Sequence, residues 1–185
     1  SGEMTNGPLL LDIVRLGRPV ILSTGMGTLG EVERALSVLA YWYATDGDRP
    51  TVEALERAFA SEEGQDALTR NVALLHCVTE YPAPVEPANL RAMDTLREAF
   101  GLPVGLSDHT RGIAVPIAAV ARGATLIEKH FTLDRSLPGP DHEASLEPDE
   151  LRRMVRGIRD AETALGTTRK VPTDPEWKNR AVARK

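Results

Sequence analysis

The chain has 185 residues, of which 42% are hydrophobic and 26% are charged, and this is enough to bury the core of one domain. The formal net charge is -5 and the basic residues are scattered, so the composition favours neither nucleic acid nor an acidic membrane as a partner. The single cysteine, Cys77, excludes an intrachain disulfide framework, and no long apolar run or leader predicts a membrane span or a signal peptide. We therefore expect a cytoplasmic protein.

Short apolar runs, each followed by a helical stretch, predict a parallel sheet covered by helices. The runs are continuously apolar rather than alternating, which is typical of strands buried on both faces. The fold class is therefore α/β, either a doubly wound sheet or a (β/α)8 barrel. Strands are expected at 19–23, 72–77, 103–107 and 124–129. Helices are expected at 29–43, 89–100, 113–122 and 148–165.

Two segments do not fit the strand–helix alternation. Residues 45–70 are longer and more charged than a simple connection, and we interpret them as a surface insertion with a short helix at 52–60. Residues 167–185 contain two prolines and mixed charges, which is typical of a linker. The sequence thus predicts one domain over 1–166 and a linker over 167–185.

The stretch GMGTLG at 25–30 has the glycine spacing of a dinucleotide-binding fingerprint and follows the first predicted strand. That fold requires an acidic residue about 20 positions later, at the end of the next strand. Here Asp46 and Asp48 fall in the polar insertion, and the next strand starts near Val72. The glycine pattern is therefore interpreted as accidental.

The third and fourth predicted strands end in polar residues, at 107–109 and 128–130. The carboxyl ends of the strands are where a barrel builds its active site, so this pattern favours a barrel over a doubly wound sheet. His109 and His130 are one βα unit apart and can reach the same point above the sheet. Two converging imidazoles can hold a divalent metal with positions open to water or substrate. The alternative is two unrelated polar residues where strands enter loops.

Other polar residues are weaker candidates. His76 lies within an apolar run and is expected to be a hydrogen-bonded core histidine. Glu128 and Lys129 alternate along a strand, so one should point to the barrel mouth and the other to a helix. The alternative is that either residue merely forms an ion pair. Asp141 and His142 lie in a polar loop after the last strand and would overhang the same mouth, although a simple turn is the alternative.

Longer motifs carry a resemblance to a known family. The segments STGM, LLHCVTEYPAP, PANLRAM, GLSDHT and IEKHFTLDRSLPGPDHEASLEPDEL together resemble the catalytic barrel of the N-acetylneuraminate (sialic acid) synthases, which include legionaminic and pseudaminic acid synthases. The resemblance runs nearly end to end, with 45–70 as its main departure. It implies a (β/α)8 TIM barrel of which this chain holds the C-terminal half, about four βα units resembling strands five to eight. The 167–185 linker would then lead to an absent antifreeze-like domain.

The resemblance implies a transferase of sialic acid biosynthesis. Such an enzyme condenses phosphoenolpyruvate with N-acetylmannosamine or a related N-acyl hexosamine and releases phosphate. The implied cofactor is a divalent metal, Mn²⁺ before Mg²⁺ or Co²⁺, held by His109 and His130. The metal would polarise the aldehyde as a Lewis acid. The full-length enzyme is expected to be a homodimer.

The same resemblance assigns the other site residues. Glu128, which would position water, and Glu3 are its catalytic carboxylates. Three serines match the phosphate contacts of the family: Ser1, Ser23 and Ser107. Three residues match its sugar-side contacts: Glu3, Tyr81 and Asp141. Thr79 also belongs to the substrate-binding set, at a position where some members carry asparagine, which leaves the acyl-sugar preference open.

Two other functions stay open. One is another phosphoenolpyruvate-dependent synthase that makes a 3-deoxy sugar acid, which should lack the GPDHEASLEPDEL loop. The other is a non-catalytic fragment that associates through its open strand edges. The 185-residue chain by itself is expected to have no appreciable synthase activity, because it holds only half of the site that the resemblance implies.

Overall fold

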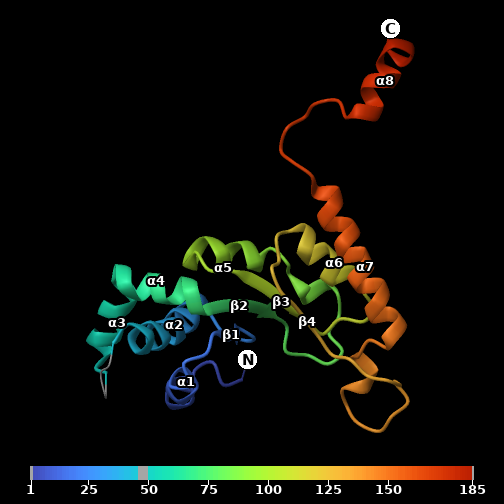
Figure 1. The fold of residues 1–185 in the computed structure, drawn as a ribbon. Coiled ribbons are helices and arrows are strands. Elements are labelled where there is room, and N and C mark those ends of the chain that lie inside the picture. Colours follow the sequence, from blue (N-terminus) through green and yellow to red (C-terminus); the bar gives the residue numbers. More distant parts are fainter. Residues whose placement is uncertain (1, 46–49, 185) are drawn as a thin grey trace.

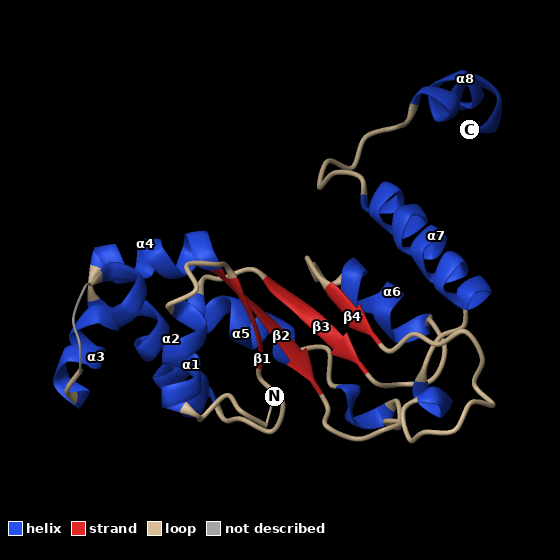
Figure 2. Ribbon diagram, turned by 60° about the horizontal axis from the view of Figure 1, so that its bottom comes forward, coloured by secondary structure: helices blue, strands red, loops and turns tan. Residues whose placement is uncertain are grey.

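A computed structural model describes residues 2–45 and 50–184 of the chain. Its centre is a four-stranded parallel sheet in the order β1-β2-β3-β4 (Figure 2), so the predicted strand number and sequential order are confirmed. The strands are β1 (Val20–Ser23), β2 (Val72–Cys77), β3 (Val104–Asp108) and β4 (Ile127–Lys129). The fourth strand begins three residues later than predicted, at Ile127 rather than Ala124.

Helices separate the strands and cover one face of the sheet (Figure 1). Helix α5 packs against β2 and β3, α6 packs against β3, and α7 packs on α6. None of the described helices is both long and apolar enough to cross a membrane. The α-helices are α1 (Gly7–Val14), α2 (Leu29–Ala44), α3 (Val52–Ala60), α4 (Glu62–Asn71), α5 (Ala92–Phe100), α6 (Ala114–Ala121), α7 (Pro148–Leu165) and α8 (Asp174–Ala183). Two 3-10 turns are η1 (Glu86–Ala88) and η2 (His142–Ala144).

The two faces of the sheet differ in burial. Leu22, Leu74 and Leu106 belong to the hydrophobic core, which lies on the helix side. Successive side chains of a strand point to opposite faces. Ile21 accordingly lies on the other face, and it is 58% exposed. That face and the ends of its strands carry the candidate site.

Three helices depart from the sequence prediction, and each begins at a side-chain cap. The Asn6 side chain accepts a hydrogen bond from the Leu9 amide at the start of α1. Ser61 caps α4 by accepting from Gly64, so the insertion contains two helices rather than one. Thr173 begins α8 within the predicted linker 167–185. A side-chain cap therefore marks the start of each of these three helices.

The predicted helix at 89–100 begins later, at Ala92. The 3-10 turn η1 and a left-handed residue, Asn89 with φ 39°, precede it. Left-handed backbone geometry at Asn89 cannot continue a right-handed helix. The start of α5 is therefore displaced to the residues after this turn.

The glycines of the GMGTLG stretch serve the turn into α2. Gly25 has φ 46°, and a Cβ atom at Gly27 would overlap the Met4 side chain. Thr28 caps α2, and its own amide donates to the Glu31 carboxylate at 2.8 Å. The Glu31 carboxylate thus already accepts a hydrogen bond at the start of α2, where a dinucleotide-binding fold would bind the pyrophosphate. Close packing and turn geometry account for the glycine spacing.

Candidate functional site

Three aromatic rings gather where the polypeptide leaves β2, β3 and β4. His109 follows β3 and His130 follows β4, and their ring centroids are 5.5 Å apart. The Tyr81 ring lies 4.2 Å from that of His109 and 5.4 Å from that of His130, measured between centroids. The structure therefore brings together the two histidines that the sequence predicted to converge.

His109 is held by the backbone of the neighbouring strand's loop. Its Nδ1 atom lies 2.6 Å from the Val78 carbonyl oxygen, and the residue is 7% exposed. Because a carbonyl oxygen can only accept, Nδ1 is the donor in this contact, and in the neutral imidazole this tautomer leaves the lone pair on Nε2. This is the arrangement in which a metal-binding histidine is oriented by its second nitrogen. The Ser107 hydroxyl lies 3.4 Å from Nε2.

The pairing of β3 with β4 sorts the polar residues onto two faces. Ser107 pairs with Glu128, and the Ser107 hydroxyl donates to the Glu128 carboxylate at 2.6 Å. Asp108 pairs with Lys129, and these two side chains form an ion pair at 2.7 Å with 2% and 3% exposure. The predicted alternation therefore holds, with Glu128 on the same side as Ser107 and Lys129 buried on the opposite side.

The separation of the two histidine rings is close to that of two imidazoles on one metal ion. Imidazoles bound to one ion at about 2.0 to 2.2 Å have ring centroids about 5 Å apart, close to the 5.5 Å between His109 and His130. In the described residues there is no group of three or more His, Cys, Asp or Glu side chains that could hold a metal. Two protein ligands would leave most coordination positions to water or substrate.

Asp141 and Tyr81 lie beside the two histidines, in the loops that follow β4 and β2. The Asp141 carboxylate is exposed and lies 4.0 Å from Nδ1 of His130. Burial raises the pKa of the Tyr81 phenol, and the charges of Cys77, Asp141 and Glu128 raise it further. The phenol therefore stays neutral at physiological pH and can donate a hydrogen bond.

The remaining predicted residues lie further out or beyond the described part. Ser23 ends β1, and its hydroxyl is 3.4 Å from the Cys77 sulfur. Thr79 is exposed in the loop after β2. Glu3 is exposed in the turn before α1, where the Asn6 side chain donates to it at 2.8 Å. Ser1 lies outside the described residues.

Several residues that shape the site gave no functional signal in the sequence. Val78 acts through its backbone carbonyl, which any residue type would supply. Arg111, after β3, forms an ion pair with Glu143 in the loop after β4, so the two loops are joined. His142 differs from these residues because the sequence did indicate it at the mouth; its Nδ1 atom lies 2.7 Å from the Thr132 hydroxyl.

The predicted core role of His76 is supported by one contact. Its Nε2 atom lies 2.9 Å from the Ala88 carbonyl oxygen, on the helix side of β2. His76 also lines a hollow of about 310 Å³ between α2 and α5, away from the other histidines. It does not contribute to the ring cluster.

Comparison with known proteins places this geometry in context. The sequence profile of the NeuB family matches residues 1–170. N,N'-diacetyllegionaminic acid synthases from Campylobacter jejuni and Legionella pneumophila are 47% and 45% identical over 185 residues, covering 100% of this chain but 48% and 46% of their own. The crystal structure of the N-acetylneuraminic acid synthetase from Leptospira borgpetersenii, in complex with citrate, matches 99% of this chain and 56% of its own, with a TM-score of 0.73 and 34% identity.

The chain thus spans about half the length of the relatives it matches. Its four parallel strands form half of a barrel-type sheet, as the structural match to the sialic acid synthetase indicates. The predicted partial (β/α)8 fold is confirmed.

Proposed function

The chain belongs to the NeuB family, and on that premise we propose that it forms part of an enzyme that condenses phosphoenolpyruvate with an N-acyl hexosamine. The relatives include an N,N'-diacetyllegionaminic acid synthase, a pseudaminic acid synthase and an N-acetylneuraminate-9-phosphate synthase. The products would be a nonulosonic acid and inorganic phosphate. The observation that carries the proposal is the convergence of His109, His130 and Tyr81, with Glu128 on the neighbouring strand.

The reaction balances without an oxidant or reductant. The enol carbon of phosphoenolpyruvate forms a bond with the aldehyde carbon, and the aldehyde oxygen takes a proton to become a hydroxyl. Water then adds to the cationic carbon that carries the phosphate. The carbon–oxygen bond to phosphate breaks, and a keto acid and inorganic phosphate leave.

Each side chain at the site has a role that its position supports. The lone pair of His109 Nε2, with His130, would hold a divalent cation, Mn²⁺ in our proposal. When bound, this cation supplies Lewis-acid polarisation of the aldehyde oxygen. Glu128 would accept a proton from the attacking water, and its bond to Ser107 fixes the carboxylate for that task. Tyr81, neutral at working pH, would donate to a sugar oxygen.

The phosphate and the sugar would contact residues at the ends of different strands. Ser23 ends β1 and offers a hydroxyl donor for the phosphate. We assign Ser107 of β3 to the phosphate side as well, where it would lie beside the phosphate while its one hydroxyl proton stays on the bond to Glu128. Asp141 lies beside His130 and would accept hydrogen bonds from sugar hydroxyls. We assign Glu3 to the sugar side as well, and Thr79 to the region that meets the acyl group. Because two similar proteins are synthases of N,N'-diacetyllegionaminic acid, we propose a di-N-acetylated hexosamine before N-acetylmannosamine as the sugar.

The experiment is a synthase assay on a complete enzyme containing this sequence and, in parallel, on the 185-residue chain alone. Mn²⁺ and phosphoenolpyruvate are supplied with N-acetylmannosamine, a di-N-acetylated hexosamine or an aldose without an acyl group. Phosphate release and product mass are measured. We expect the complete enzyme to use an acylated sugar and the isolated chain to be inactive, because catalysis needs its groups held within fractions of an ångström.

The results separate the candidate functions. A preference for the unacylated aldose would favour a 3-deoxy sugar acid synthase instead. No phosphate release by the complete enzyme with any sugar would refute the proposed reaction. Product formed by the isolated chain at the rate of the complete enzyme would refute our expectation that this half of the sheet is insufficient.

A further inference from the structure

Behind the histidines, on the helix side of the sheet, lies a fully bonded ion pair. The Lys129 ammonium is 2.7 Å from Oδ2 of Asp108 and also donates to the Thr110 carbonyl oxygen. Oδ1 of Asp108 accepts from the Thr110 amide at 3.0 Å and from the Thr110 hydroxyl at 2.8 Å. The side chains of Asp108 and Lys129 are 2% and 3% exposed. None of the reaction steps above uses these charges.

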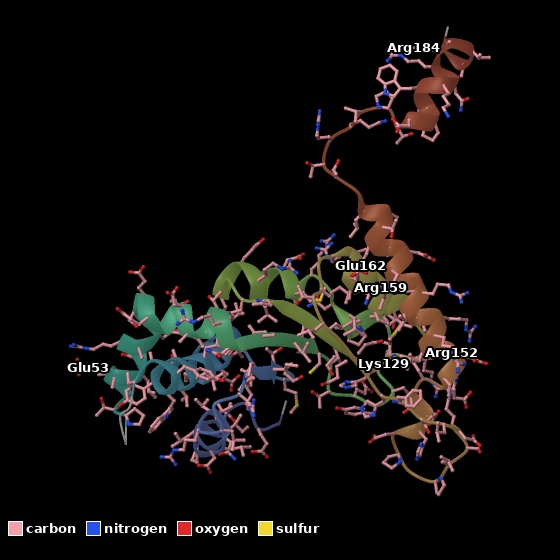
Figure 3. The ribbon with its side chains drawn as sticks, viewed as in Figure 1. Glu53, Lys129, Arg152, Arg159, Glu162 and Arg184 are labelled. Atoms are coloured by element: carbon pink, nitrogen blue, oxygen red, sulfur yellow. The ribbon has the colours of Figure 1, made fainter. Side chains whose placement is uncertain are left out.

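The pair occupies a particular place in the chain. Asp108 and Lys129 are partners in the β3–β4 register and are the last residues of their strands. His109 and His130 are the next residues of the two strands. Figure 3 labels Lys129 on β4, and its side chain is 3% exposed. The ion pair is therefore the last side-chain link between the strands before the two histidines.

Stability alone is a weak reason for such a pair. Removing two charges from water costs free energy that their attraction often fails to recover. Apolar residues of similar volume at the same positions commonly stabilise a fold at least equally. What an ion pair adds is a fixed distance and direction, because each hydrogen bond tolerates little displacement. Lys129 meets both Asp108 and the Thr110 carbonyl, so it ties β4 to the backbone just beyond His109.

We propose that Asp108 and Lys129 are positioning residues that fix the separation of His109 and His130 and thereby set the affinity and geometry of the metal site. This inference rests on the proposed function, since it presumes that the two histidines bind a divalent cation. The pair acts through the backbone of the strand ends and touches neither substrate nor metal.

The test is the double variant Asp108→Asn/Lys129→Met in a complete synthase containing this sequence. Asparagine keeps an acceptor for Thr110, and methionine keeps the volume of the lysine stem, so both charges disappear together and neither is left unpaired. We expect the melting temperature to fall by several degrees, because methionine leaves the Thr110 carbonyl oxygen without its donor. We expect Mn²⁺ affinity to weaken by about tenfold or more, as for other groups that orient ligands. The visible spectrum of the Co²⁺-loaded enzyme should also shift.

A matched control removes an exposed ion pair of the same type. Glu53 and Arg57 on α3 form one at 2.7 Å, with side chains 71% and 79% exposed. The variant Glu53→Gln/Arg57→Met should leave Mn²⁺ affinity and the Co²⁺ spectrum unchanged. A merely stabilising role for Asp108 and Lys129 predicts the same unchanged values in their double variant once it is folded.

The outcomes distinguish this inference from the proposed function. If the unaltered enzyme binds Mn²⁺ and the double variant binds it equally with the same Co²⁺ spectrum, the positioning role is overturned and the metal site stands. If the unaltered enzyme binds no divalent cation, both are overturned. Should the double variant fail to fold, Lys129→Arg is the second variant. It keeps the positive charge but replaces the compact ammonium by a planar guanidinium, so we expect Mn²⁺ affinity to be lowered. Unchanged affinity and spectrum in that variant would equally overturn the positioning role.

Discussion

Replacing His109 by asparagine separates its metal-binding atom from its structural atom. Nδ1 of His109 lies 2.6 Å from the Val78 carbonyl oxygen, and the residue is buried. The asparagine amide nitrogen occupies nearly the position of Nδ1 and can donate the same hydrogen bond, but nothing in asparagine reaches the position of Nε2. The variant should therefore keep the fold and lose the metal.

The structure sets the size of both effects. His109→Ala leaves the Val78 carbonyl without its partner, which costs about 1 to 3 kcal/mol. In a domain of this size each kcal/mol lowers the melting temperature by about 2 to 4 °C, so alanine should cost several degrees and asparagine much less. Loss of an orienting partner alone weakens metal binding by about 10- to 100-fold, so loss of a ligand should exceed about 100-fold.

The assay is a Mn²⁺ titration of a complete synthase carrying each variant, in which free Mn²⁺ is measured by electron paramagnetic resonance. Thermal unfolding of the same variants is measured in parallel. Mn²⁺ affinity and activity of His109→Asn within tenfold of the unaltered enzyme would remove His109 from the metal site. Equal loss of thermal stability in the asparagine and alanine variants would show that the Val78 contact does not hold the ring.

Two further predictions concern the strands and the ring cluster. Gly105→Ala should lower the melting temperature, because the new Cβ would lie 2.7 Å from Cβ of Leu126 and 2.8 Å from Cδ2 of Leu75; such overpacking costs about 1 to 3 kcal/mol, and an unchanged melting temperature would contradict it. The raised pKa of Tyr81 means that folding favours the protonated phenol, so stability should fall as the pH rises past about 10. Denaturant unfolding as a function of pH should show a smaller fall in Tyr81→Phe, and an identical fall would refute the assignment.

Much of the fold could be predicted from the sequence because parallel strands buried on both faces are written as short apolar runs. The run VALLHC predicted β2 over Val72–Cys77 with both boundaries correct. The short strand β4 was predicted too long because Ala124 and Thr125 are apolar or neutral enough to extend the pattern. The Ala124 amide instead donates to the Ala119 carbonyl oxygen in the turn after α6, whereas the Thr125 amide donates to the Val104 carbonyl oxygen at the start of β3.

The site could be predicted only in part, because its contacts depend on strand register and on the backbone. Residue types at strand ends indicated His109 and His130, and the structure shows them close together. The bond from Ser107 to Glu128 requires knowing which residues of β3 and β4 are opposite each other. The Val78 carbonyl carries no side-chain signature at all.

The β3–β4 register explains how one short stretch on each strand performs two different tasks. Side chains alternate across a sheet, so the pairing of Ser107 with Glu128 and of Asp108 with Lys129 sends one polar pair to the reaction side and the other into the core. A slip of β4 by one residue would exchange its two faces, so that Glu128 would turn towards the core and Lys129 away from Asp108. The buried ion pair penalises that slip strongly, since each charge would lose its counter-charge in a water-free setting. The charges that take no part in the reaction therefore protect the register on which the reactive residues depend.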